Sequence, residues 1–439
     1  MSGDNSLLRD DCIRGEIEDF HYIQWLATVM SHLPRSARWE HRRVNFGEHV
    51  EQLMHEGKFR NEYRMSLSAF EHLVDTLAPS LQRDEHRSRS AQAIQPEHIA
   101  ALGLRALGGG RLSDIRHIIG CSRAAAYVAF DDFVNAVNAC PEFDIINFPV
   151  TASEWKAVND GFTAKSSDGI MQGCVGAIDG YFQRVQAPRQ KEVGNVEAYY
   201  SGHYEDYGVN CQACVKSDLS FMYFGVVAPG STNDNISYPM AVGMKNAIEN
   251  LPPGLYCVAD AAYTLGETLI IPFTGVDRND KAQDAFNFYL SQLRIRVEMA
   301  FGRLTNKFRI LKGSIVGSLD RVTAIVMACA RLHNYIIMMD GSTDTSFNES
   351  GEEINQDDDR VFSIKPHPDA PLGMSYLPVI PGDDWEQYDG ISYARLAIVE
   401  HLREQGIGHP QYNLDRKQDE LVHSCNYSSR WSREYVSPI

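Results

Sequence analysis

The sequence lacks the features that place a chain outside the cell or in a membrane. Its nine cysteines have no repeated paired spacing, which indicates reduced thiols and no disulfide framework. The first residues, Met1-Ser-Gly-Asp-Asn-Ser6, show no apolar run behind a basic start, so no secretory signal is expected. The longest apolar run, Val322 to Met339, contains Arg331, His333 and Asn334. Such polar side chains predict a buried amphipathic helix and no membrane span.

An excess of positive charge is also missing. The chain carries 41 Lys and Arg against 58 Asp and Glu, a formal charge of −17. Residues 341–439 hold 8 basic and 18 acidic side chains (−10), whereas residues 171–340 hold 15 and 16 (−1). The middle of the chain would therefore become mildly positive once bound cations neutralised its carboxylates, which suits a phosphate backbone locally. Cys211 and Cys214 form one C-x-x-C without a second pair, so no zinc site is expected.

Three carboxylates stand at the ends of patterned segments far apart in the chain. The apolar, strand-like run Gly173-Cys-Val-Gly-Ala-Ile-Asp-Gly180 ends on Asp179, and Leu255-Tyr-Cys-Val-Ala-Asp260 ends on Asp260. Glu298 lies in the helical, arginine-rich segment 294–303. Buried like charges are unfavourable unless they are paired or bind a metal. The pattern therefore predicts divalent cations and metal-assisted phosphodiester cleavage.

Two of the acidic residues have alternative interpretations. Asp234 precedes a predicted helix and could cap it, or could be a fourth metal-facing carboxylate. Glu298 could pair with Arg294, four residues earlier on the helix, as an ordinary surface salt bridge. The two upstream aspartates favour the metal site for Glu298.

The helix around Glu298 also carries the basic residues that could hold phosphates. At 100° per residue, Glu298 shares one margin of the apolar stripe with Arg294 and Arg309. The opposite margin is lined by Arg296, Arg303 and Lys307. We predict contacts from Arg294, Arg296, Arg303 and Lys307 to DNA phosphates.

The predicted strands and helices indicate an α/β fold, an RNase H-like domain over residues 170–340 with a mixed sheet layered by helices. The strands are expected at 174–179, 208–215, 221–228 and 255–260, with a fifth at 269–273 and a helix at 238–250. The first three are expected to be antiparallel neighbours. The fourth follows the helix.

An all-α part is expected before the sheet. Residues 1–60 form a peripheral helical segment, and residues 61–150 a helix-turn-helix-like domain with helices from Tyr63 to Pro79 and at 96–107. Residues 112–130 show the helix-turn-helix pattern, with Ser122 as a cap and Arg123 facing DNA. An ordinary helical hairpin explains the same pattern. Residues 341–439 are expected to be a largely disordered acidic tail with one helix, 391–404.

Several short motifs, in this order, make the chain similar to the PIF/Harbinger superfamily of DDE transposases and their domesticated relatives. They are Val175-Gly-Ala-Ile-Asp-Gly180, Tyr200-Ser-Gly-His203, Tyr207-Gly-Val-Asn-Cys-Gln-Ala213, Pro229-Gly-Ser-Thr-Asn-Asp234, Ala259-Asp-Ala-Ala-Tyr263, Arg296-Val-Glu-Met-Ala-Phe-Gly-Arg-Leu304 and Leu332-His-Asn334. The chain departs from the family at His203-Tyr-Glu-Asp206, where members often carry basic residues.

The resemblance implies an RNase H-like nuclease with metal-binding carboxylates at Asp179, Asp260 and Glu298, and a further acidic position at Asp234. Two Mg²⁺ or Mn²⁺ ions are then expected to promote DNA cleavage or strand transfer in the nucleus. The resemblance also implies a separate Myb-like DNA-binding partner, and it leaves the oligomeric state open. The alternatives are a domesticated DNA-binding or scaffold protein without transposition activity, and a host nuclease acting on other nucleic acid.

Overall fold

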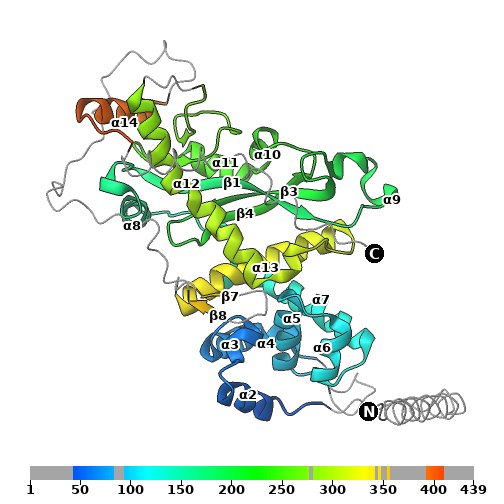
Figure 1. Cartoon of the computed structure of the whole chain (residues 1–439). Coiled ribbons are helices and arrows are strands. Elements are labelled where there is room, and N and C mark those ends of the chain that lie inside the picture. The colour runs from blue at the N-terminus through cyan, green and yellow to red at the C-terminus, as the bar shows by residue number, and fades with distance from the viewer. Residues whose placement is uncertain are drawn as a thin grey trace, which may run out of the picture.

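The computed structural model describes residues 43–83, 93–275, 280–341, 345–347, 353–355 and 392–409. The predictions for residues 1–42 and for most of the acidic tail lie outside the described residues. Within them, Figure 1 shows a sheet covered by helices, with helix α13 between the sheet and the N-terminal helices.

The N-terminal helices follow their capping signals closely. The side chain of Ser66 accepts a hydrogen bond from Ala69 N at the start of α4, and that of Ser122 accepts one from Ala125 N at the start of α7. Gly120 ends α6 in the left-handed region at φ 73°, which favours glycine. The helices are α2 (Phe46–His55), α3 (Phe59–Tyr63), α4 (Leu67–Leu81), α5 (Pro96–Leu107), α6 (Leu112–Ile119), α7 (Arg123–Ala139) and α8 (Ala152–Thr163).

The sheet is mixed, as predicted. Its order is β2-β3-β1-β5-β6, with β4 also paired to β3. The pairs β1–β3, β2–β3 and β3–β4 are antiparallel, and β1–β5 and β5–β6 are parallel. The strands are β1 (Cys174–Arg184), β2 (Tyr200–Ser201), β3 (Asp206–Val215), β4 (Phe221–Pro229), β5 (Tyr256–Val258) and β6 (Leu269–Ile270). A mixed sheet flanked by helices is compatible with an RNase H-like domain.

Helices cover both faces of this sheet. Short helices α9 (Gln190–Val193), α10 (Asp234–Met240) and α11 (Val242–Glu249) precede the two long helices α12 (Lys281–Lys307) and α13 (Leu319–Asp340). Met244 and Ile248 of α11 pack with Val175 and Ile178 on one side, whereas α12 and α13 belong to the main core, which continues into α4, α5 and α7. The small strands β7 (Thr345–Phe347) and β8 (Glu353–Asn355) pair with each other, and α14 (Tyr393–Glu404) follows.

Helix α13 is long and apolar enough to cross a membrane by length and composition alone. It is instead a core helix, as predicted, because it packs between α7 and β4. Asn334 accepts a hydrogen bond from Phe221 N and donates one to Phe221 O, both at 2.8 Å. The ring of His333 contacts Leu219 O at 2.9 Å. The Leu332-His-Asn334 motif therefore secures the start of β4.

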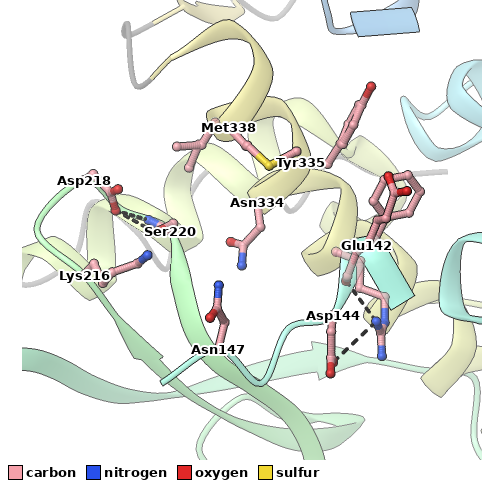
Figure 2. Close-up of a pocket in the computed structure, with 12 residues that line it drawn as sticks. Glu142, Asp144, Asn147, Lys216, Asp218, Ser220, Asn334, Tyr335 and Met338 are labelled. Carbon is pink, nitrogen blue, oxygen red and sulfur yellow. Dashed lines mark hydrogen bonds and ion pairs between the residues drawn. The ribbon is translucent and has the colours of Figure 1, made fainter. Parts of the chain in front are cut away.

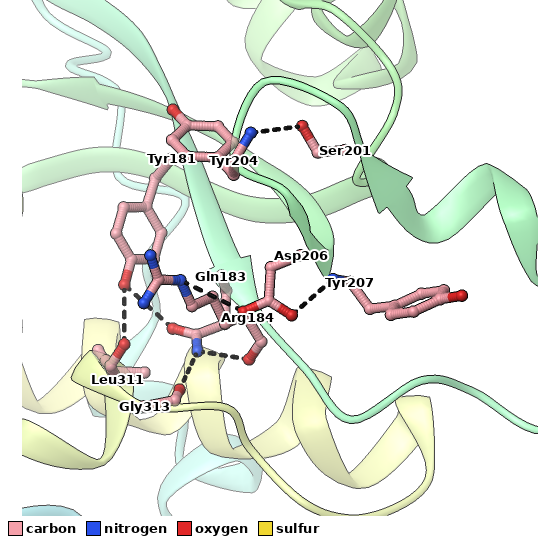
Figure 3. Close-up of polar contacts among 9 residues, drawn as sticks. All are labelled: Tyr181, Gln183, Arg184, Ser201, Tyr204, Asp206, Tyr207, Leu311 and Gly313. Atoms are coloured by element: carbon pink, nitrogen blue, oxygen red, sulfur yellow. Dashed lines mark hydrogen bonds and ion pairs between the residues drawn. The ribbon is translucent and has the colours of Figure 1, made fainter. Parts of the chain in front are cut away.

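Strand β1 does not stop at Asp179, as its apolar run had suggested, but continues to Arg184. Pairing with β3 carries it on, since Phe182 lies opposite Asn210. The Tyr181 hydroxyl bonds Gln183 at 3.0 Å and the Leu311 carbonyl at 3.4 Å, and the Gln183 amide reaches the Gly313 carbonyl at 3.1 Å (Figure 3). These contacts join the extended strand to the segment between α12 and α13.

Three other boundaries differ from the prediction. Helix α4 passes through Pro79 and ends at Leu81, two residues after the proline that was expected to end it. The helix predicted at 238–250 is divided at Ala241 into α10 and α11. The helix predicted at 391–404 begins at Tyr393, and it packs on α12 with Val399 and Leu402 buried in the main core.

Candidate active site

Asp179 lies on an interior strand of the sheet, with its side chain toward α12. Its Oδ1 accepts a hydrogen bond from Gly180 N at 2.8 Å. Burial raises the pKa of Asp179 to about 7, against the lowering effect of the Gly180 N–H. The charges of Asp260 and Asp234 raise this pKa further, and Arg294 lowers it. The carboxyl group is therefore held where additional negative charge is unfavourable.

Asp260 is brought to Asp179 by the parallel pairing of β5 with β1. Ala177 pairs with Val258, so Asp179 within β1 and Asp260 just after β5 each stand two residues beyond this pair. Asp260 Oδ1 accepts a hydrogen bond from Ala262 N at 2.9 Å, which fixes the carboxylate in a tight turn. The predicted convergence of these two residues is thus present in the fold.

Asp234 does not cap α10. That role belongs to Asn233, whose side chain accepts from Ile236 N at 3.1 Å. Asp234 Oδ1 instead accepts hydrogen bonds from Asn210 Nδ2 at 3.1 Å and from Gln212 Nε2 at 2.8 Å. The carboxylate is oriented by β3 and lies against Gly180, where an added Cβ would come within 2.0 Å of Asp234 Oδ1.

Tyr263 is a member of the site that sequence analysis did not single out. Its hydroxyl donates to Gln212 Oε1 at 2.7 Å, so Gln212 links the tyrosine to Asp234. Burial raises the pKa of Tyr263, and the charges of Asp234, Asp179 and Asp260 add to that shift. Its presence in the motif Ala259-Asp-Ala-Ala-Tyr263 was the available signal. The tyrosine stays a neutral donor that holds the surrounding polar side chains.

Glu298 is linked to Asp179 by an arginine that contacts both carboxylates. Arg294 Nη1 lies 2.6 Å from Glu298 Oε1 and 3.8 Å from Asp179 Oδ2. The i, i+4 ion pair on α12, the alternative interpretation of Glu298, is therefore formed, and the same guanidinium also contacts the β1 carboxylate. The Glu298 side chain remains half exposed.

The ligand atoms suit a hard divalent cation, because such cations prefer carboxylate oxygens. A cation would also supply the positive charge that the buried carboxylate of Asp179 lacks. Within the described part of the chain, however, no group of three His, Cys, Asp or Glu side chains is arranged to hold one ion. Arg294 supplies the positive charge between Asp179 and Glu298. The carboxylates are ligands of the right type for a divalent cation. For three of them to bind the same ion, either Arg294 or the carboxylates must move.

The basic residues predicted to contact DNA are distributed differently. Arg294 alone among them is placed at the carboxylates. Arg296 is buried, and burial together with Arg303 lowers the pKa of Lys307 to about 8. Arg123 is exposed on α7, with its guanidinium 5.9 Å from the centre of the Tyr127 ring. Arg296 thus points into the fold, and Lys307 is partly buried.

A separate cavity of about 300 Å³ lies by the turn between β3 and β4 (Figure 2). Asn147, Lys216, Asn334 and Met338 are among the residues that line it. Arg331 spans one side, donating to the Phe143 carbonyl at 2.9 Å. Asp179, Asp234 and Asp260 do not line this cavity, so it is distinct from the candidate active site.

Residues 178–334 match the family model of the DDE superfamily endonucleases. The chain is related to this superfamily. The match begins next to Asp179 and ends on Asn334, so it contains every carboxylate of the candidate site. The resemblance to Harbinger-type DDE proteins is thereby confirmed, and DDE superfamily endonucleases generally use divalent metals.

Two curated relatives extend the comparison. "Protein ALP1-like" of Arabidopsis thaliana is 25% identical over 258 residues, which cover 55% of this chain and 61% of that protein. "Putative nuclease HARBI1" of Xenopus laevis is 26% identical over 279 residues, covering 62% of this chain and 75% of that protein. The chain thus spans less than two thirds of the length of the first relative. No solved structure matches it.

Proposed function

We propose that this DDE domain cuts phosphodiester bonds in DNA with divalent cations, Mg²⁺ or Mn²⁺, held by Asp179, Asp260 and Glu298. One observation carries the proposal. Asp179 is a largely buried carboxylate whose pKa is raised by burial and by two further aspartates from separate segments of the chain. Such a concentration of negative charge is typical of a cation site in a nuclease.

The chain's own residues would prepare the site as follows. Asp179, Asp260 and Glu298 would hold the cations. Asn210 and Gln212 orient Asp234, which would be a further ligand or would hold the edge of the site. Bound cations would supply Lewis-acid activation of the attacking oxygen and stabilise the leaving oxygen.

The arginine on α12 would have a second role. Arg294 neutralises Glu298 and Asp179 in this structure. With cations present, its guanidinium would be released toward a DNA phosphate, which it can contact through two parallel N–H donors. The arginine would then exchange one anionic partner for another.

The test is Asp260→Asn, which removes a charged ligand at nearly constant volume. We expect Mg²⁺-dependent nicking of supercoiled plasmid to be lost, with melting temperature and DNA affinity unchanged. Asp320→Asn, an exposed aspartate in the first turn of α13, is the matched control. Nicking by Asp260→Asn at the wild-type rate would exclude Asp260 as an essential ligand.

A second candidate is a domesticated DNA-binding or scaffold protein without cleavage activity. The contacts of Arg294 favour this candidate, since its guanidinium already neutralises two of the carboxylates, Asp179 and Glu298. The same assay separates the two: a scaffold would bind DNA and cut none with Mg²⁺ or Mn²⁺.

We also propose that target recognition is shared with a Myb-like partner and takes place in the nucleus. The formal charge of −17 supports the need for a basic partner, because an acidic chain is repelled by DNA at long range. Co-purification with and without the partner, followed by binding to terminal repeats, would test this proposal.

A further inference from the structure

The turn between β2 and β3 displays aromatic side chains beside the carboxylates. Tyr200 pairs with Tyr207 and Ser201 with Asp206, leaving residues 202–205 as the tip of the turn. The Tyr204 N–H is held by the Ser201 hydroxyl at 3.4 Å (Figure 3). The tip is therefore a defined turn that fixes the main chain of Tyr204.

Tyr204 stacks on Phe182 of β1. The ring centres are 4.3 Å apart and the planes differ by 12°, a nearly parallel arrangement. Phe182 rests on Gly208 and Gly230, where an added Cβ would come within 2.2 Å and 2.7 Å of its ring. Only glycine leaves room for the ring at these two positions. The stack is thus supported by Gly208 of β3 and by Gly230, which directly follows β4.

The tyrosine remains open to solvent above this support. Tyr204 is 48% exposed although one face of its ring is covered by Phe182. His203 approaches it edge-on, with ring centres 4.7 Å apart and planes at 82°. The ring is therefore held in place on one face and remains accessible to a ligand on the other.

The stack is next to the catalytic candidates. Phe182 follows Gly180 by two residues on the face of β1 that Asp234 packs against, whereas the side chain of Asp179 points to the other face, toward Arg294 of α12. The charges of Asp234 and Asp179 both act on the Tyr204 hydroxyl. If one nucleotide of a DNA strand binds at the carboxylates, the adjacent nucleotides of that strand would therefore lie close to the Tyr204 ring.

Charge does not explain how this turn would contact DNA. Its tip carries Glu205, and the adjacent Asp206 is paired with Arg184 at 3.6 Å. The basic residues common in the family at this turn are absent. Stacking needs no charge and accepts any base, because every base has a π-face.

We propose that Tyr204, supported by Phe182, is a stacking platform for an unpaired nucleobase next to the scissile phosphate. This inference rests on the proposed function and names its substrate class: DNA that is single-stranded or unpaired at the site of cutting. A duplex base would first have to leave the helix, which is easiest at a fork, a nick or a mismatch.

The experiment uses the full chain in EDTA, so that binding is measured without cutting. The probes are forked and continuous DNA duplexes of equal length, each with 2-aminopurine at the same position, unpaired in the fork. We expect fluorescence quenching with the fork alone. Tyr204→Leu should lower affinity for the fork by roughly 5- to 150-fold, the range for loss of one stacked base, and leave duplex affinity unchanged.

Two further variants control for side effects. Tyr204→Phe keeps the ring and should retain fork binding. Tyr393→Leu removes a tyrosine of similar exposure, 38%, on α14 and should also retain it. Tyr204→Leu preserves the apolar cover over Phe182, so folding is maintained, and melting temperatures verify this.

The possible results separate the two proposals. Equal fork binding by wild type and Tyr204→Leu, or no quenching by wild type, would overturn the platform whether or not the protein cuts DNA. Quenching that depends on Tyr204 in a protein that never nicks DNA with Mg²⁺ or Mn²⁺ would leave the platform in place and overturn the proposed nuclease function.

Discussion

Arg294 and Asp179 face each other across the boundary between α12 and the sheet, with Nη1 and Oδ2 3.8 Å apart. The same nitrogen lies 2.6 Å from Glu298. One guanidinium therefore compensates two of the three carboxylates that the sequence assigns to a cation site. A bound cation and Arg294 compete for the same negative charge.

Removing this arginine should strengthen cation binding. We expect Arg294→Gln to raise Mn²⁺ affinity, measured by calorimetry without DNA, by roughly two- to five-fold, because a partly exposed ion pair contributes about 0.5–1 kcal/mol. Arg184→Gln, which breaks the exposed pair with Asp206, is the control and should leave Mn²⁺ affinity unchanged. Weaker Mn²⁺ binding by Arg294→Gln would contradict the competition.

Asp179 should make the metal-free protein less stable as pH rises. Its pKa is about 7 in the folded protein, against an ordinary value of 3.8 for an aspartate. Between these values the native state binds more protons than the unfolded state, so the free energy of unfolding falls with increasing pH. Asp179→Asn should therefore be more stable than wild type at pH 8, by a few kcal/mol at most, and similar at pH 4.

Chemical denaturation in EDTA at both pH values measures this difference. Mg²⁺ should stabilise wild type at pH 8 more than it stabilises the variant, because the ion binds only the folded protein. Equal stabilities of the two proteins at pH 8 in EDTA would contradict the raised pKa.

Gly180 should be intolerant of a side chain. A Cβ there would come within 2.0 Å of Asp234 Oδ1, so Gly180→Ala must displace the carboxylate from Asn210 and Gln212. We expect a loss of about 1–3 kcal/mol in the free energy of unfolding, the cost of disrupting buried hydrogen bonds. Gly302→Ala on α12, where no atom lies within 4 Å, should be neutral or stabilising. Equal melting temperatures for both variants would contradict this packing.

Helix α14 should contribute to stability. Leu402 is 1% exposed against the core, whereas Leu396 on the same helix is 45% exposed. We expect Leu402→Ala to cost about 2 kcal/mol or more, since it leaves a cavity, and Leu396→Ala to cost little. Hydrogen exchange of α14 should accelerate in the first variant only. Unchanged exchange in Leu402→Ala would mean that α14 is held by its polar contacts.

The features that the sequence predicts correctly are those that depend on neighbouring residues. The strand before Asp179, the cap at Ser122 and the alternative interpretation of Glu298 as the partner of Arg294 all depend on residues a few positions apart, and all are present. The hydrogen bonds of Asp234 join residues 22 and 24 positions apart. They depend on strand register, which the sequence alone leaves undetermined.

The docking of α14 was missed for a related reason. A helix with few apolar residues in an acidic segment is predicted to be exposed to solvent, because its own sequence does not show which helix it packs against. Val399 and Leu402 are buried because α14 packs on α12. Tertiary packing decided what composition could not.

The position of α14 has a consequence for how such chains can diverge. The chain leaves α13 at Gly341 and contacts α12 first through β7 and again through α14, and residues 356–391 connect β8 to Ser392 before α14. Closing so long a connection depends weakly on its length, with each doubling costing about 0.6 kcal/mol. We expect insertions or deletions between residues 356 and 391 to cost little, so a tag or a foreign recognition module can be grafted there without disturbing the carboxylates.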